Sequence, residues 1–235
     1  MFLQGKRILF FSAHLFGYQN DIRLAMESVG AIVDYYDERP ANNFLVKGVI
    51  RINRNLLAGY INHYYNKIIK ETLQKEYDYV FFIKGESISA SNVRRLKQFH
   101  PEANFIIYHW DSIANNSTAQ NIFPYFDRVF SFDKIDCERL GLHFLPLFYT
   151  PDYANIPYYD KEIKYDMLFV GTTHSDRYKL VKRIEEQIIK MGGLCLTWFY
   201  FPSKILYYKM KILNSYLCQI PVHTFHFKPM SKELL

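Results

Sequence analysis

Cysteine is scarce in this sequence, and long hydrophobic runs are missing. The 235 residues include three cysteines, and no two of them have the CxxC spacing of metal-binding motifs. An odd number without that spacing indicates a reducing compartment and argues against a zinc site. No apolar run reaches the roughly 18 residues that a transmembrane helix needs, and the N-terminus lacks the layout of a signal peptide. We therefore expect a cytoplasmic protein.

Motifs of nucleic-acid-binding proteins are missing as well. The net charge of +6 and a pI near 9.0 permit contact with nucleic acid, but no RRM, KH, helix-turn-helix or zinc-finger pattern is present. The first expected strand also lacks the acidic pair of a response regulator and the phosphate loop of a flavodoxin. We therefore expect no nucleic acid partner, and we disfavour both of those α/β folds.

The composition is that of a globular protein. Hydrophobic residues make up 49% of the chain and charged residues 22%, which excludes a disordered chain. Aromatic residues make up 18%. That share is typical of a protein rich in stacked rings or one beside a membrane, and equally of an AT-rich genome. The length suits one large domain or two small ones.

Short apolar runs alternate with helical patterns through the first 150 residues or so. Such runs fill parallel sheets that are buried on both faces, and βαβ units connect them with a right-handed crossover. Helices are expected to start at Asn20 or Asp21, at Ser91 and at Asp133. The expected strands cover residues 7–11, 31–36, 79–83, 105–108 and 128–132. The pattern predicts an α/β domain with a Rossmann-type parallel sheet.

Polar residues follow several of these strands directly. Open α/β sheets bind ligands at the carboxyl ends of their strands, so we expect these residues along one edge. Two of them are histidines that could equally be structural. Asp111 follows a buried strand and lies beside Trp110, where a carboxylate can have a raised pKa and act as a base. The residues at this edge are His14, Gly17, Lys84, Glu86, His109 and Asp111.

Positive charge is concentrated in one helical segment. Residues 41–75 contain six basic residues and one acid, Glu71. Apolar positions recur there with a helical period, and Gly48 and Gly59 divide the segment into more than one helix. The basic face is either an ordinary solvated surface or a contact with an anionic membrane, where aromatic side chains insert.

The stretch YDMLFVGTTHSDRY at residues 165–178 starts the strand-to-helix pattern a second time. A strand ends at Gly171, a polar run follows, and Ser175 is expected to cap the next helix. A Gly-containing turn that leads into a helix N-terminus points free N–H groups and the helix dipole at one spot. This turn is either an anion site or an ordinary connection.

Four strings together resemble a known family. KGESIS at 84–89, YHWDSI at 108–113, FDRVFSFDKID at 126–136 and the stretch at 165–178 are similar to those of bacterial capsular-polysaccharide and lipopolysaccharide glycosyltransferases of the GT-B type, related to a spore-maturation protein. The resemblance implies an acceptor-side domain at 1–150, a linker at 151–164 and part of a donor-side domain at 165–235. It implies sugar transfer from a nucleotide-sugar to a polysaccharide or lipid-linked acceptor, at the inner face of the membrane.

The resemblance also implies roles for individual residues. Either Asp111 or His14 would remove the acceptor hydroxyl proton. Arg177 would match phosphate oxygens with its guanidinium fork, unless it is a plain surface charge. The sequence has no Asp-x-Asp pair, so no metal or other cofactor is expected. The donor would be held by Gly171, Thr172, Thr173, His174 and Arg177, and the acceptor by Gly17, Lys84, Glu86 and His109.

The second domain is too short for this family. Residues 166–235 supply 70 residues, and a nucleotide-binding domain needs about twice that number. They leave room for strands at 194–200 and 221–227 and a basic helix at 204–213, with a further helix beginning at 231. The Gly-rich loop and the acidic residue that grips the ribose are missing. The alternative is therefore a truncated, non-catalytic binding or assembly protein of the same pathway.

Overall fold

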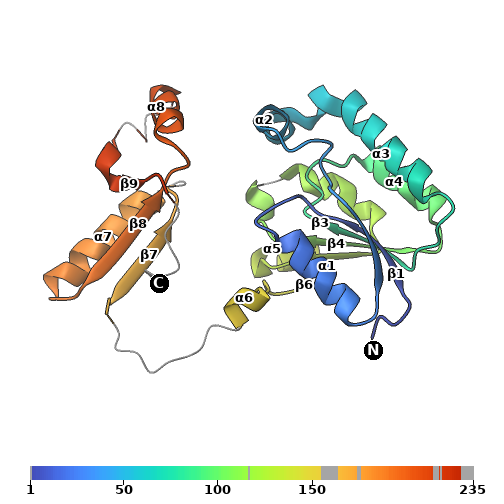
Figure 1. Cartoon of the computed structure of the whole chain (residues 1–235), viewed down its shortest axis with the longest axis horizontal. Coiled ribbons are helices and arrows are strands. Elements are labelled where there is room, and N and C mark those ends of the chain that lie inside the picture. Colours follow the sequence, from blue (N-terminus) through green and yellow to red (C-terminus); the bar gives the residue numbers. More distant parts are fainter. Residues whose placement is uncertain are drawn as a thin grey trace. The chain divides into compact units, whose positions relative to one another are not determined.

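The structure is a computed structural model that describes residues 2–115, 117–154, 164–173, 176–213, 217 and 219–228. The chain divides into two compact units, Met1–Ile156 and Pro157–Leu235. Each unit has its own parallel sheet, and Figure 1 shows their elements. No helix in the described ranges is long and apolar enough to cross a membrane.

The first unit is a six-stranded parallel sheet with helices on both faces, which confirms the predicted Rossmann-type α/β fold. The strand order is β2-β1-β3-β4-β5-β6. Its strands are β1 (Arg7–Phe11), β2 (Ile32–Tyr36), β3 (Tyr79–Ile83), β4 (Asn104–His109), β5 (Arg128–Ser131) and β6 (His143–Phe144). Its helices are α1 (Tyr18–Ser28), α2 (Phe44–Asn53), η1 (Arg54–Leu57), α3 (Ala58–Thr72), α4 (Ala90–Phe99), η2 (Ile113–Asn115), η3 (Ser117–Tyr125), α5 (Lys134–Leu140) and α6 (Pro151–Ala154).

The alternation of side chains along β1 shows why both faces must be covered. Leu9 and Phe11 are buried in a core with residues of α3, α4 and η3, whereas Ile8 and Phe10 pack on the other face, toward α1. Figure 1 shows α1 on one side of the sheet and α3 with α4 on the other. A strand that is apolar on both faces reads as a continuous hydrophobic run, which is why the sequence revealed it.

Two local features differ from the sequence expectations. Helix α1 begins at Tyr18 instead of Asn20 or Asp21, because Gly17 adopts φ 88° at the N-cap and its carbonyl accepts the Asn20 N–H at 2.8 Å. Only glycine takes that backbone conformation readily. The sixth strand, β6, was not predicted, since it has two residues and offers no run for a pattern to detect.

The second unit is a three-stranded parallel sheet with order β7-β8-β9. Val181 of α7 and Tyr207 of α8 pack with Phe199 in its core. The predicted cap residue Ser175 lies outside the described residues, as does the helix expected from residue 231. The elements are β7 (Met167–Gly171), α7 (Arg177–Lys190), β8 (Cys195–Tyr200), α8 (Lys204–Leu213), η4 (Val222–Thr224) and β9 (Phe225–His226).

Candidate functional site

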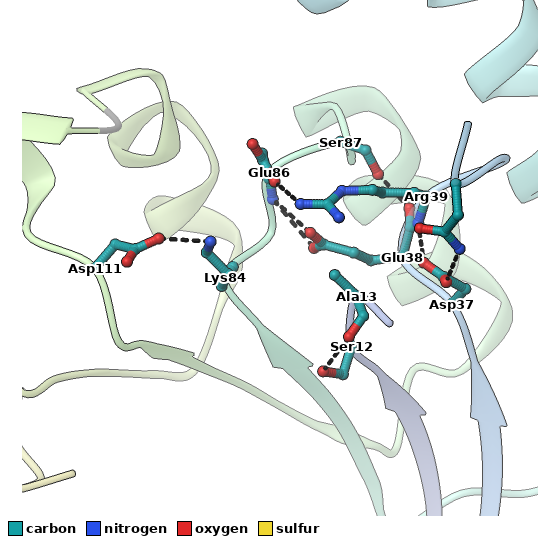
Figure 2. Close-up of polar contacts among 10 residues, drawn as sticks. Ser12, Ala13, Asp37, Glu38, Arg39, Lys84, Glu86, Ser87 and Asp111 are labelled. Atoms are coloured by element: carbon teal, nitrogen blue, oxygen red, sulfur yellow. Dashed lines mark hydrogen bonds and ion pairs between the residues drawn. The ribbon is translucent and has the colours of Figure 1, made fainter. Parts of the chain in front are cut away.

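The carboxyl edge of the six-stranded sheet is the place where polar side chains converge. Strand β1 lies between β2 and β3, so chain connections leave in opposite directions on its two sides. Such a switch point opens a crevice beyond the carboxyl ends of the strands, and α/β proteins bind ligands there. Figure 2 shows the residues that follow β1, β2, β3 and β4 at this edge.

Glu38 joins the exits of β2 and β3. Its carboxylate oxygens accept the Glu86 backbone N–H at 3.1 and 3.3 Å, and its carbonyl accepts the hydroxyl of Ser87 and that of Tyr65, the latter at 2.9 Å. The side chain is fully buried. Burial, and then the charge of Glu86, raise the pKa of Glu38 to about 8. Glu38 therefore carries a proton at neutral pH.

Arg39 and Glu86 form a second, almost completely buried contact between the same two exits. Their guanidinium and carboxylate are paired, with only 4% and 13% of the side chains exposed. Arg54 lies close by, donates to the Ile88 carbonyl at 2.9 Å and has a pKa lowered by burial. A buried ion pair that loses one partner leaves an uncompensated charge, so this contact holds the two loops together.

Lys84 leaves β3 in a left-handed conformation. Its φ is 73°, and Gly85 follows with φ 62°. A side chain on Gly85 would come within 2.6 Å of Ile122 Cδ1 and 2.9 Å of Ile107 Cδ1, so the backbone runs tightly over the core. The Lys84 Nζ lies 2.5 Å from Asp111 Oδ2, after β4. Asp111 is the more open partner, with 43% of its side chain exposed against 12% for Lys84.

His109 is the last residue of β4 and is fully buried. Neither ring nitrogen has a hydrogen-bond partner among the described residues, and the ring packs against Phe123 with centroids 5.2 Å apart. Burial lowers the pKa of His109 to about 4, so the imidazole is neutral at pH 7. The ring is closed off from solvent. Direct contact between His109 and an acceptor stays a prediction.

His14 and Gly17 belong to the loop that follows β1. His14 is exposed, and its Nδ1 lies 3.0 Å from Nε2 of the buried Gln19. The same Gln19 accepts the Leu15 N–H through Oε1 at 3.2 Å. Gln19 thereby holds the loop shape and orients the imidazole, which leaves His14 accessible at the edge.

An aromatic pocket of about 400 Å³ opens beside Asp111. The rings of Tyr18, Trp110 and Phe148 contact one another with centroids 5.8 to 6.2 Å apart. Asp111 and the buried Thr150 are polar groups in the wall. The wall residues are Leu15, Tyr18, Trp110, Asp111, Leu147, Phe148, Tyr149, Thr150 and Tyr153.

Sequence reasoning missed most of this pocket. Tyr18 precedes the helix start that was expected at Asn20 or Asp21, and residues 147–153 span the expected boundary between the first domain and the linker. The run of apolar and aromatic residues before Pro151 was the available signal. It follows β6, so it is itself a strand exit at the same edge, but β6 was too short to be recognised.

The residues expected to hold a donor lie in the second unit. Gly171 ends β7, Thr172 is exposed and Thr173 is buried. Arg177 is exposed as the first residue of α7, and its Nη1 donates to the Thr172 carbonyl at 3.4 Å. The structure thus brings these residues into one turn. His174 lies outside the described residues.

Metal-binding groups are not gathered anywhere in the described part of the chain. No three side chains of His, Cys, Asp or Glu lie close enough together there to hold a metal ion. Cys137 and Cys195 are free thiols, and burial raises the pKa of both.

Comparisons with known proteins give little beyond the fold. No family model and no curated protein matches the chain. Among solved structures, the chain is similar to a "Putative transcriptional regulator" from Clostridium difficile 630, at 12% identity and a TM-score of 0.33. The similarity covers 90% of this chain and 63% of that one. At this score it carries no functional argument.

The resemblance to GT-B glycosyltransferases of capsular and lipopolysaccharide biosynthesis is therefore wrong as a family assignment. No family model and no curated protein matches the chain, so no glycosyltransferase relative supports the assignment. The reason lies in the strings themselves. KGESIS, YHWDSI and FSFDKID are strand exits followed by helix caps, a pattern that any parallel α/β sheet repeats at each crossover.

Proposed function

We propose that the first unit binds a neutral, polyhydroxylated ligand of the saccharide class in the aromatic pocket. The observation that carries this proposal is the position of the Lys84–Asp111 ion pair, whose carboxylate lines a pocket of aromatic rings at the carboxyl edge of the sheet. Binding pockets of this size are mostly apolar, with a few polar groups that fix the orientation of the ligand.

The chemistry of the pocket favours a sugar over a charged ligand. The C–H face of a pyranose packs against aromatic rings, which Tyr18, Trp110 and Phe148 supply. A hydroxyl group can donate to the Asp111 carboxylate, which is 43% exposed and lines the pocket. Because the charges of Asp111 and Lys84 already neutralise each other, a cationic or anionic ligand would gain little.

Sugar transfer from a nucleotide-sugar to the bound saccharide is the more specific form of this proposal. It is supported by Asp111 and His14, two groups at the edge that could accept a hydroxyl proton. A donor would need the turn of Gly171 and Arg177 in the second unit. The alternative is a non-catalytic binding protein, for which the pocket alone suffices.

Titration calorimetry on the full chain separates these readings. We expect methyl glycosides to release heat and to quench the fluorescence of Trp110 in a Trp198→Phe background. Asp111→Asn should weaken binding by about tenfold or more, because a hydrogen bond to a charged group is lost. Glu102→Gln, an exposed carboxylate at the opposite end of β4, serves as the matched control. No heat with any glycoside would refute the proposal.

Heat with nucleotide diphosphates, and its loss in Arg177→Ala, would support transfer over binding alone. Lys190→Ala, at the far end of α7, is the matched control. If glycosides bind and no nucleotide diphosphate does, the non-catalytic reading stands.

We also propose that the first unit contacts an anionic membrane surface from the cytoplasmic side. A groove of about 410 Å³ between α3 and α4 has a cationic rim and an apolar floor that includes Ile69. The cationic rim residues are Lys67, Lys70 and Arg95, and His63 lies beside them. Exposed Leu73 and Phe99 lie in the same groove. Basic and apolar side chains together suit a lipid surface.

Co-sedimentation with vesicles tests this second proposal. The full chain should bind vesicles that contain phosphatidylserine but not vesicles of phosphatidylcholine alone, and Lys67→Glu with Lys70→Glu should abolish binding. Lys190→Glu, on α7 of the second unit, is the control. Equal binding to both kinds of vesicle, or salt-dependent binding to oligonucleotides instead, would count against a membrane contact.

A further inference from the structure

A second cavity adjoins the aromatic pocket along α1. It has a volume of about 620 Å³ and an apolar lining in which Asp21 is the one charged residue. Its floor is the sheet face formed by Phe81 and Ile83 of β3 and Tyr108 of β4. One wall is formed by Ile22, Ala25 and Met26 of α1 and by Val29, the C-cap residue of that helix. The other wall is formed by Leu145, Phe148, Tyr149, Pro151 and Ala154. We call this cavity the α1 groove.

The α1 groove and the aromatic pocket share two wall residues, Phe148 and Tyr149. Phe148 contacts Tyr18 and Trp110 on the pocket side, with ring centroids 5.9 and 5.8 Å away. The two cavities therefore adjoin at these rings. Each cavity has one carboxylate in its lining, Asp111 in the pocket and Asp21 in the groove, and the rest of the groove lining is aliphatic, aromatic or proline side chains.

The polar atoms at the floor of the groove are already satisfied. The Tyr108 hydroxyl donates to the Pro146 carbonyl at 3.2 Å, so it offers the ligand a ring and no free donor. A polar chain would lose its hydrogen bonds to water on entering such a groove and regain few of them. A hydrocarbon chain loses none and gains from burial.

We propose that the α1 groove and the aromatic pocket form one site for an amphiphile, a saccharide head group that carries an apolar chain. The head group occupies the pocket beside Asp111, and the chain lies along α1 over the sheet. This inference rests on the proposed saccharide site and adds the class of the molecule that the head group belongs to.

Chain length is the variable that tests the groove. Binding of methyl and n-octyl glycosides of glucose, galactose and N-acetylglucosamine to the full chain is compared by titration, below the micelle-forming concentration. Each buried methylene strengthens binding about fourfold. The octyl compound should therefore bind at least about tenfold more tightly than the methyl compound of the same sugar, even if few methylenes are buried.

Tryptophan substitutions in α1 and at its C-cap show where the apolar chain binds. Ala25→Trp fills the groove and should remove the octyl advantage while the affinity for methyl glycosides stays the same. Leu24→Trp is the matched control, because Leu24 is an exposed neighbour outside the groove lining, and it should leave both affinities unchanged. Val29→Trp, at the end of the groove, replaces Ala25→Trp if that variant does not fold.

Three results overturn the proposal, and they can be told apart. Equal affinity for methyl and octyl glycosides excludes a chain in the groove while leaving the saccharide site intact. An octyl advantage that survives Ala25→Trp and Val29→Trp places the chain elsewhere. Octyl triethylene glycol that binds as tightly as the octyl glycosides shows an apolar site without a sugar, and then the saccharide function fails.

Discussion

Glu38→Gln should make the first unit more stable at alkaline pH, because the wild-type carboxyl is buried and its pKa is raised to about 8. Its usual value is 4.5. Below pH 4.5 the group is protonated in the folded and unfolded states alike. Between 4.5 and 8 the unfolded chain releases the proton and the folded chain keeps it, so stability falls as pH rises. The loss is complete above pH 8.

The size of the effect follows from the shift. One pKa unit corresponds to about 1.4 kcal/mol, so the wild-type protein should lose about 4 kcal/mol of unfolding free energy between pH 5 and pH 9 from this group. Glutamine keeps the shape and an oxygen that accepts the Glu86 N–H. It carries no proton to lose. The variant should therefore match the wild type near pH 5 within about 1 kcal/mol and exceed it at pH 9.

Urea unfolding at pH 5, 6, 7, 8 and 9 measures this difference, since urea leaves the ionic strength unchanged. Trp110 lies in the first unit and Trp198 in the second, so Trp110 fluorescence in a Trp198→Phe background reports on the first unit alone. Glu102→Gln is the control for an exposed carboxylate. A difference between Glu38→Gln and wild type that does not change with pH would refute the reasoning.

Two further predictions concern residues at the same edge. His109→Leu should protect the first unit against acid. Because the pKa of His109 is lowered to about 4, the stability of the wild-type protein falls as pH drops from 6.5 to 4, and the variant, followed by the same fluorescence, should lack that part of the loss. An unchanged loss of stability in acid would contradict the burial of a neutral imidazole. Gly85→Ala should lower the free energy of unfolding by about 1 to 3 kcal/mol, because Gly85 has φ 62° and a side chain there would contact Ile122 and Ile107. The loss should exceed that in Gly17→Ala, since Gly17 has φ 88° but open space around it. Equal urea midpoints for the two variants would show that the core around Gly85 adjusts to the added methyl group.

The sequence was a good guide to the sheet because burial on both faces leaves a strong pattern. The run at residues 79–83, for example, is apolar or aromatic at every position. In the first unit, the boundaries of each predicted strand lie within a residue or two of the observed boundaries. Helix starts were less certain. The side chain of Ser89, and not that of Ser91, accepts the N–H of Asn92 to cap α4, because either serine satisfies the pattern and only the backbone geometry decides.

The site was predictable only as an edge. Position after a strand placed Lys84 and Asp111 together, and the structure joins them at 2.5 Å. The sequence did not indicate that Glu38 connects the exits of β2 and β3, because Glu38 is only one of several polar residues that follow a predicted strand. The aromatic pocket depends on residues 15–18, 110–111 and 147–153. No periodicity links such distant segments, so tertiary structure alone reveals it.

The protonation states at the carboxyl edge explain why a neutral ligand suits it. Glu38 keeps its proton at pH 7, and His109 lacks one, because each is buried where a charge would be costly. Arg39 pairs with Glu86. The Lys84 charge is paired with that of Asp111. In each of these two ion pairs the charges compensate each other, so an ionic ligand gains little from them, and Asp111 presents a carboxylate acceptor in the pocket wall. Hydroxyl groups on a sugar ring match that arrangement, and a phosphate would have to break one of the pairs.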